Sequence, residues 1–98
     1  MGMESVFDEV AAERARQDER WGEQNQDDFV WGAILAEEVG EVNRAMLEAR
    51  DGNGGGNLRE ELLQVAAVAV AWVESIDRRA GRSLNEPGRP TGSEAADV

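Results

Sequence analysis

The chain has 98 residues, enough for one domain, and contains neither cysteine nor histidine. Disulfides and metal sites built from Cys or His are therefore excluded, and only oxygen ligands remain for any bound metal. The 21 acidic residues outnumber the 10 basic ones, all of them arginine, and the net charge of -11 argues against binding to the phosphate backbone of an extended nucleic acid.

The first predicted element is a helix over residues 3–20. Met3, Phe7 and Val10 recur at helical spacing among the good helix formers Ala, Glu, Gln and Arg. Residues 21–28 carry Gly, Asn and paired Asp, a composition typical of a loop. The chain therefore begins with a helix followed by a short polar connection.

A second helix is predicted over residues 29–50, with Asp27 or Asp28 as its N-cap. Its apolar residues form a narrow seam that is widened by three neighbours; the seam is Leu35, Val39, Val42 and Met46, and the neighbours are Trp31, Ile34 and Ala45. The helix ends at residues 51–56, because consecutive glycines make further helix costly in conformational entropy.

A third helix is predicted to start after Asn57 as N-cap, with Glu60 at the N3 position and Gly81 as the C-cap. Its apolar seam is Leu58, Leu62, Val65, Ala69, Trp72 and Ile76. Residues 66–73 are apolar nearly all round, which predicts burial on more than one side. Residues 83–98 hold two prolines and almost nothing large and apolar, which predicts a disordered tail.

These elements predict an all-α fold, in which an antiparallel helical hairpin and an N-terminal helix form one domain over residues 1–82. About 80 residues are close to the lower limit for a stable monomeric core. We therefore expect homo-oligomerisation to complete a multi-helix bundle. Residues 1–8 lack the basic and apolar parts of a secretory leader, and no apolar run is long enough to span a bilayer, so we expect a cytoplasmic protein that does not enter membranes.

Two acidic clusters interrupt the apolar faces of the hairpin, EEVGE at residues 37–41 and EELLQ at residues 60–64. At about 100° per residue, Glu38 and Glu61 each lie about 70° from the centre of their seams, in the same rotational sense. The second member of each pair lies about 60° further round. Antiparallel packing then brings both pairs to the same side of the interface.

We expect this convergence to bind Mg²⁺ or Mn²⁺, because carboxylates beside an apolar seam repel one another unless a cation lies between them. Carboxylate and amide oxygens are the ligands that such hard cations prefer. The predicted metal ligands are Glu37, Glu38, Glu41, Glu61 and Gln64. Glu37 and Glu38 are the predicted catalytic residues, with Glu37 placed to bind a second ion or to accept a proton from an attacking water.

The pattern EExxE, followed after nineteen residues by ExxQ on a second helix, resembles the MazG-type all-α nucleoside triphosphate pyrophosphohydrolases, whose signature is EExxE, a variable gap and ExxD. The resemblance covers residues 31–76. It implies Mg²⁺-dependent hydrolysis of a (d)NTP to the monophosphate and pyrophosphate by a homodimer or homotetramer. Glu38, Glu41 and Glu61 match the family's metal ligands, and Glu37 matches its extra acidic position.

Gln64 departs from that signature, because the family has Asp at the matching position. The amide keeps an oxygen donor but has no charge. This departure motivates an alternative function, a catalytically weak or silent helical module that binds metal, nucleotide or a protein partner.

Three further residues are candidates for substrate binding, Trp21, Trp31 and Arg44. Trp21 is placed to contact a nucleobase or to staple its loop, whereas the seam position of Trp31 favours the core. Arg44 is placed for a phosphate contact or for a surface salt bridge. Surface pairing with Glu13 and Glu19 is expected for three other arginines, with phosphate contact across a subunit boundary as the alternative: Arg14, Arg16 and Arg20.

Overall fold

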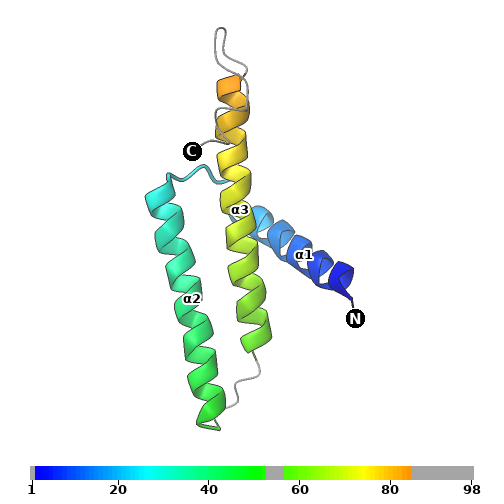
Figure 1. Ribbon diagram of the computed structural model, residues 1–98, viewed down its shortest axis with the longest axis vertical. Helices are drawn as coiled ribbons and strands as arrows, with labels where there is room; N and C mark the ends of the chain where they lie inside the picture. The colour runs from blue at the N-terminus through cyan, green and yellow to red at the C-terminus, as the bar shows by residue number, and fades with distance from the viewer. Residues whose placement is uncertain (1, 53–56, 85–98) are drawn as a thin grey trace.

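The computed structural model describes residues 2–52 and 57–84. They form three helices, α1 (Met3–Trp21), α2 (Asp28–Arg50) and α3 (Leu58–Leu84). Because the described residues contain helices and no strands, the predicted all-α class is confirmed. Helices α2 and α3 lie side by side and run in opposite directions, while α1 crosses α3 and projects away from the hairpin (Figure 1).

The connection between α1 and α2 is fixed at both ends by local hydrogen bonds. Helix α1 ends at Trp21 and is capped by Gly22, whose φ of 73° is a left-handed conformation that favours glycine. The Gly22 N–H donates to the Asp18 carbonyl at 2.7 Å. Helix α2 begins after Asp27, whose side chain accepts from the Val30 N–H at 2.9 Å. The predicted N-cap is therefore confirmed, and the loop it closes forms part of the cavity described below.

Two predictions about the end of α3 are wrong. The helix continues through Gly81 to Leu84, so Gly81 is not its C-cap and residues 83 and 84 are helical rather than part of a disordered tail. A single glycine costs about 1 kcal/mol in a helix, and the good helix formers Arg78 and Arg79 precede it in the same helix. The predicted glycine turn at residues 53–56 and the remaining tail at residues 85–98 lie outside the described residues.

The described apolar core lies between α2 and α3. It is built on Trp31 (4% exposed), Val68 and Ala71, against which Ile34, Leu35 and Trp72 pack. The face of α3 that is buried consists of Ala67, Val68, Ala71 and Ser75, whereas four apolar side chains of the same helix are at least 40% exposed: Leu62, Val70, Val73 and Ile76. Of the predicted seam of α3, Trp72 packs against the core, whereas Leu62 and Ile76 are exposed, so the buried face is rotated from the predicted one. Burial on more than one side is found, because α3 packs against both α2 and α1. Because residues 66–73 are apolar nearly all round, their pattern does not specify which face meets α2.

Helix α1 is joined to α3 through polar side chains. The Arg14 guanidinium contacts the Glu74 carboxylate at 2.6 Å, and Glu9 forms an ion pair with Arg59 near the start of α3. The position of α1 thus depends on charge and hydrogen bonding, in contrast to the apolar contact between α2 and α3.

No helix in the described part of the chain combines the length and the apolarity needed to cross a membrane.

Candidate functional site

Glu38 of α2 is half-buried and surrounded by other carboxylates. Burial raises the pKa of Glu38, and repulsion from Glu61 of α3 is the next largest cause, followed by repulsion from Glu41, Glu37 and Glu13. Glu38 and Glu61 are therefore close enough to repel each other across the α2–α3 interface. The structure brings the two predicted acidic clusters to one side of the hairpin.

Two carboxylates of this group form ion pairs with arginines. Arg44 lies 3.4 Å from Glu41, and Arg16 lies 2.6 Å from Glu13. In this arrangement, no group of three or more Asp, Glu, His or Cys side chains in the described residues is set to hold a metal ion. Shared coordination of an ion by these carboxylates would therefore require their side chains to rotate.

Gln64 is held by two side chains of α1. Its Oε1 accepts from Gln17 Nε2 at 3.4 Å, and its own Nε2 donates to Glu13 Oε2 at 2.6 Å. Burial opposes ionisation of Glu13, but hydrogen bonds from Arg16 and Gln64 outweigh it and lower the pKa of that carboxyl. Glu13 and Gln17 therefore join the site, although neither was predicted as a site residue.

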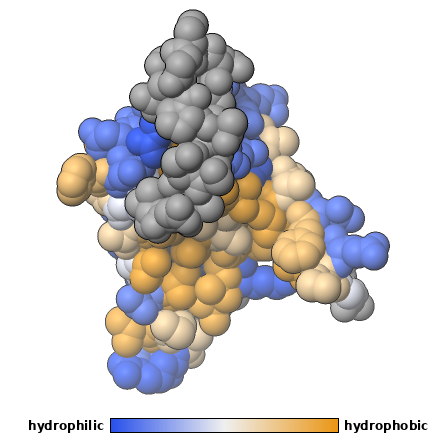
Figure 2. Space-filling model, turned by 45° about the horizontal axis from the view of Figure 1, so that its top comes forward, coloured by the Kyte–Doolittle hydropathy of each residue, from blue (hydrophilic) through white to orange (hydrophobic). Residues whose placement is uncertain are grey.

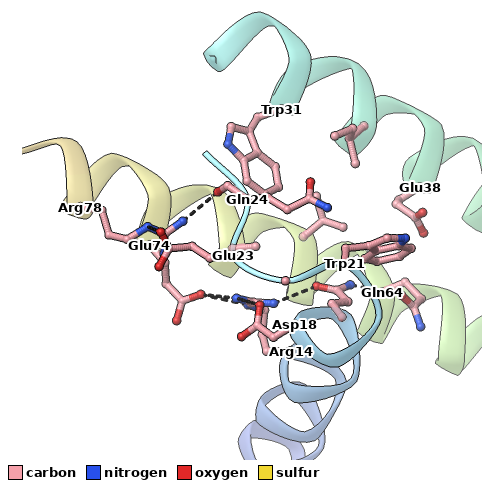
Figure 3. A pocket seen from close by; sticks show the side chains of 15 residues that line it. Arg14, Asp18, Trp21, Glu23, Gln24, Trp31, Glu38, Gln64, Glu74 and Arg78 are labelled. Carbon is pink, nitrogen blue, oxygen red and sulfur yellow. Dashed lines mark hydrogen bonds and ion pairs between the residues drawn. The ribbon is translucent and has the colours of Figure 1, made fainter. Parts of the chain in front are cut away.

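A cavity of about 400 Å³ adjoins the acidic group. It lies between α1, the α1–α2 loop, α2 and α3, and its volume is within the range of small-molecule sites. Figure 3 shows Glu38 and Gln64 near Trp21 on one side of the cavity, and Glu74 and Arg78 on the other. The cavity therefore reaches from Glu38, Gln64 and Trp21 to a region lined by Glu74 and Arg78.

Two tryptophans line the cavity. Trp31 is 4% exposed, and its indole Nε1 is buried without a hydrogen-bond partner among the described residues. Trp21 is 56% exposed at the end of α1, with the Arg20 guanidinium 5.0 Å from its ring centre. The predicted core position of Trp31 is confirmed, and the same side chain forms a wall of the cavity.

The arginines divide between the cavity and the outer surface. Arg14 and Arg78 line the cavity, where Arg14 is held by Asp18 and Glu74, and Arg78 Nη2 donates to the Gln24 carbonyl at 2.8 Å. Of the three arginines expected to pair with Glu13 or Glu19, Arg16 forms an ion pair with Glu13. Arg14 instead pairs with Asp18 and Glu74, and the Arg20 guanidinium lies over the Trp21 ring. Arg44 does not line the cavity, and its contact with Glu41 is the surface salt bridge that was one of its two predicted roles.

Comparisons of the chain with protein-family models, with curated proteins and with solved structures found no match.

The raised pKa of Glu38 predicts that replacing its charge stabilises the metal-free protein. Because the folded-state pKa lies above the unfolded value, ionised Glu38 opposes folding at about pH 8, and this opposition disappears as the pH falls through the folded-state pKa. Glu38→Gln should therefore raise the melting temperature at about pH 8 in the presence of a chelator, by more than at about pH 5.

Thermal denaturation followed by circular dichroism measures this difference. Glu48→Gln is the matched control, because Glu48 is another half-buried glutamate of α2 and is not among the residues that repel Glu38. Equal effects of the two substitutions at both pH values would show that Glu38 is not under electrostatic strain.

Proposed function

We propose that this protein is a Mg²⁺-dependent nucleoside triphosphate pyrophosphohydrolase similar to the MazG-type enzymes, acting on cytoplasmic nucleotides. Its reaction is hydrolysis of a (d)NTP to the monophosphate and pyrophosphate. The observation that carries the proposal is the position of Glu38 on α2, which lines a cavity of about 400 Å³ and is repelled by Glu61 on α3.

The donor atoms fit a hard divalent cation. Four carboxylates and one amide supply only oxygen, and a cation among half-buried carboxylates removes the repulsion that raises the pKa of Glu38. The residues assigned to hold Mg²⁺ or Mn²⁺ are Glu37, Glu38, Glu41, Glu61 and Gln64. When bound, such an ion polarises a phosphoryl oxygen and stabilises the negative charge of the transition state.

The chain's own residues supply positioning and proton transfer. A water oxygen forms a bond to the α-phosphorus, the bond from that phosphorus to the bridging oxygen breaks, and pyrophosphate leaves. Glu37, exposed and next to Glu38 in the sequence, accepts the proton that the water loses when it does not bind a second ion. The nucleobase is placed against Trp21, because this ring is 56% exposed, lines the cavity, and aromatic faces stack on any nucleobase. Trp31, the other tryptophan of the cavity, is 4% exposed and serves as a wall.

A second candidate function is nucleotide or metal binding with little or no hydrolysis. It is favoured by Gln64, whose oxygen and nitrogen are both hydrogen-bonded within the protein, and by Glu41, which is paired with Arg44. These contacts compete with an ion for two of the assigned ligands. The two functions differ in turnover and share the same site.

We also infer that copies of the chain associate as a homodimer or a homotetramer. Large apolar side chains on α2 and α3 remain at least 40% exposed in one chain: Val39, Met46, Leu47, Leu62, Val70, Val73 and Ile76. Figure 2 shows apolar side chains gathered over a continuous part of one face. Soluble monomers rarely leave large apolar areas open, so a second copy is the simplest cover for them.

Hydrolysis is tested by measuring pyrophosphate release from each dNTP and NTP with Mg²⁺ or Mn²⁺. The wild type should release pyrophosphate from at least one of them, and Glu38→Gln or Glu61→Gln should reduce the rate at least about 100-fold with helicity retained, because each removes a charged metal ligand. Glu48→Gln should leave the rate unchanged. No release from any nucleotide at high protein concentration would refute catalysis.

Gln64→Asp separates the two candidate functions in the same assay. If the wild type is a working enzyme, this change should alter the rate only a few-fold, since the amide already provides an oxygen. A large gain from a silent wild type would instead assign this chain to binding without turnover.

Removal of the exposed ring of Trp21 should weaken substrate binding. Base stacking contributes about 1–3 kcal/mol, so Trp21→Ala should raise KM between about 5-fold and 150-fold with little change in kcat. The control is Phe29→Ala, because Phe29 is 91% exposed and does not line the cavity. Similar KM values for both variants would show that Trp21 does not contact the substrate.

A charge on the exposed apolar surface of α3 should prevent association. Analytical ultracentrifugation of the wild type should give twice or four times the chain mass of 10.7 kDa, and Val73→Asp should shift the mass toward that of one chain. Met3→Asp is the control, since Met3 is 71% exposed at the projecting end of α1. A wild type that sediments as a single chain would contradict the inferred association.

A further inference from the structure

The face of α1 that packs against α3 is almost entirely polar. The residues of this helix that are buried or half-buried recur at helical spacing: Ser5, Glu9, Val10, Glu13, Arg14 and Gln17. Among these residues of the fully described helix, only Val10 is apolar. The side chains of Met3 and Phe7 are instead 71% and 62% exposed. Helix α1 therefore docks with little of the apolar burial that holds α2 against α3.

Two ion pairs connect α1 to α3 at separate points. Arg59 donates from Nη1 and Nη2 to the two carboxylate oxygens of Glu9 near the start of α3. Arg14 donates from Nε and Nη2 to Glu74 Oε1 at 3.0 and 2.6 Å. The side chains of Glu9, Arg59 and Glu74 are at least 38% exposed. Because exposed ion pairs contribute little to stability and are weakened by salt, these contacts hold α1 weakly.

The other contacts of α1 with α3 are also ones that water can replace. Gln64 accepts from Gln17 at 3.4 Å and donates to Glu13 at 2.6 Å. When α1 moves away from α3, these polar groups exchange their bonds for bonds to water, so little free energy is lost. The docking face of α1 thus tolerates exposure in a way that an apolar face does not.

The chain is attached to α3 again directly after α1. Arg78 donates to the Gln24 carbonyl at 2.8 Å and to Asn25 Oδ1 at 3.0 Å. Between this anchor and α1 lies Gly22, whose φ of 73° glycine adopts without steric cost. The Gly22 N–H bonds to the Asp18 carbonyl within the end of α1, so rotation about the following backbone bonds leaves this cap intact. Gly22 is therefore the point at which α1 can turn while the loop and the hairpin stay in place.

Helix α1 forms one wall of the cavity, to which it contributes Arg14, Gln17, Asp18 and Trp21. Figure 3 shows Arg14 reaching from this wall to Glu74 of α3. A turn at Gly22 carries the wall away from the lining residues of α2 and α3 and opens the cavity to solvent. The Glu9 ion pair lies about 20 Å along α1 from Gly22, at 1.5 Å per residue, and so holds the helix at the end opposite this pivot.

We propose that α1 is a hinged lid over the cavity, which turns at Gly22 and is held closed by the Glu9–Arg59 and Arg14–Glu74 ion pairs. Rising ionic strength screens these pairs and shifts α1 toward the open position, in which a ligand has access to the cavity. This inference goes beyond the proposed hydrolysis and depends neither on catalysis nor on a bound ion.

Distances between two spin labels, measured by double electron–electron resonance on the full chain, test the lid. The chain contains no cysteine, so labels attach only at introduced positions. One label pair joins α1 to α3, Ala12→Cys with Asp77→Cys, and the control pair joins α2 to α3, Ala36→Cys with Asp77→Cys; all three positions are exposed. Dilution with unlabelled chain removes distances between copies in an oligomer.

Raising the salt concentration from about 0.1 M to about 1 M should shift the α1–α3 distances toward longer values, because the Debye length falls from about 10 Å to about 3 Å. Arg59→Glu and Glu9→Arg should each raise the ratio of open to closed α1 at least about twofold at the lower salt concentration. The two substitutions together restore the pair with exchanged signs and should return the closed distance. Glu19→Arg makes the same charge change at an exposed position of α1 and should leave the distances unchanged.

An α1–α3 distance that neither salt nor Arg59→Glu changes overturns the proposal. Lengthening of both label pairs also overturns it, because the hairpin itself is then separating. A double substitution that fails to restore the closed distance contradicts the role of the Glu9–Arg59 pair. If Arg59→Glu loses its helical circular dichroism signal, Arg59→Gln replaces it: a smaller shift in the same direction is expected, and no shift is contradictory.

Discussion

Repulsion among half-buried carboxylates is the constraint on which this site depends. Apolar contact between α2 and α3 holds Glu38 and Glu61 near each other, and the resulting desolvation and repulsion raise the pKa of Glu38. The proposed divalent cation would relieve this repulsion. In the proposed function, the stability that this repulsion costs is the counterpart of affinity for an ion, as is common where stability and function compete.

Helix α1 gives this region its shape. Its ion pair with Glu74 and its contact with Gln64 place Arg14, Gln17 and Trp21 around the cavity, so the cavity exists only while α1 is docked. Because polar bonds hold that helix, its position is more sensitive to charge changes than the apolar α2–α3 contact. The two sides of the cavity, at Glu74 and at Gln64, are therefore coupled through Arg14 and Gln17 of α1.

The helices and much of the acidic group could be predicted from the sequence, because they depend on local rules. Asp27 caps α2 as its position in the pattern indicates, and the angular offsets place Glu38 and Glu61 on one side of an antiparallel pair. The buried face of α3 could not be predicted, since Val70 and Val73 are as apolar as Val68 and Ala71. Glu13 and Gln17 were missed because their roles depend on the crossing of α1 over α3, which no local pattern encodes.

The central claim, that Glu38 and Glu61 share one ion, is tested most directly by a double-mutant cycle of melting temperatures with and without Mg²⁺. In chelator, changing either residue to Gln should stabilise the protein, and the second change should add less because the repulsion between the two is already gone. In Mg²⁺, each change should destabilise the protein instead. Additive effects that are the same in both conditions would contradict the account.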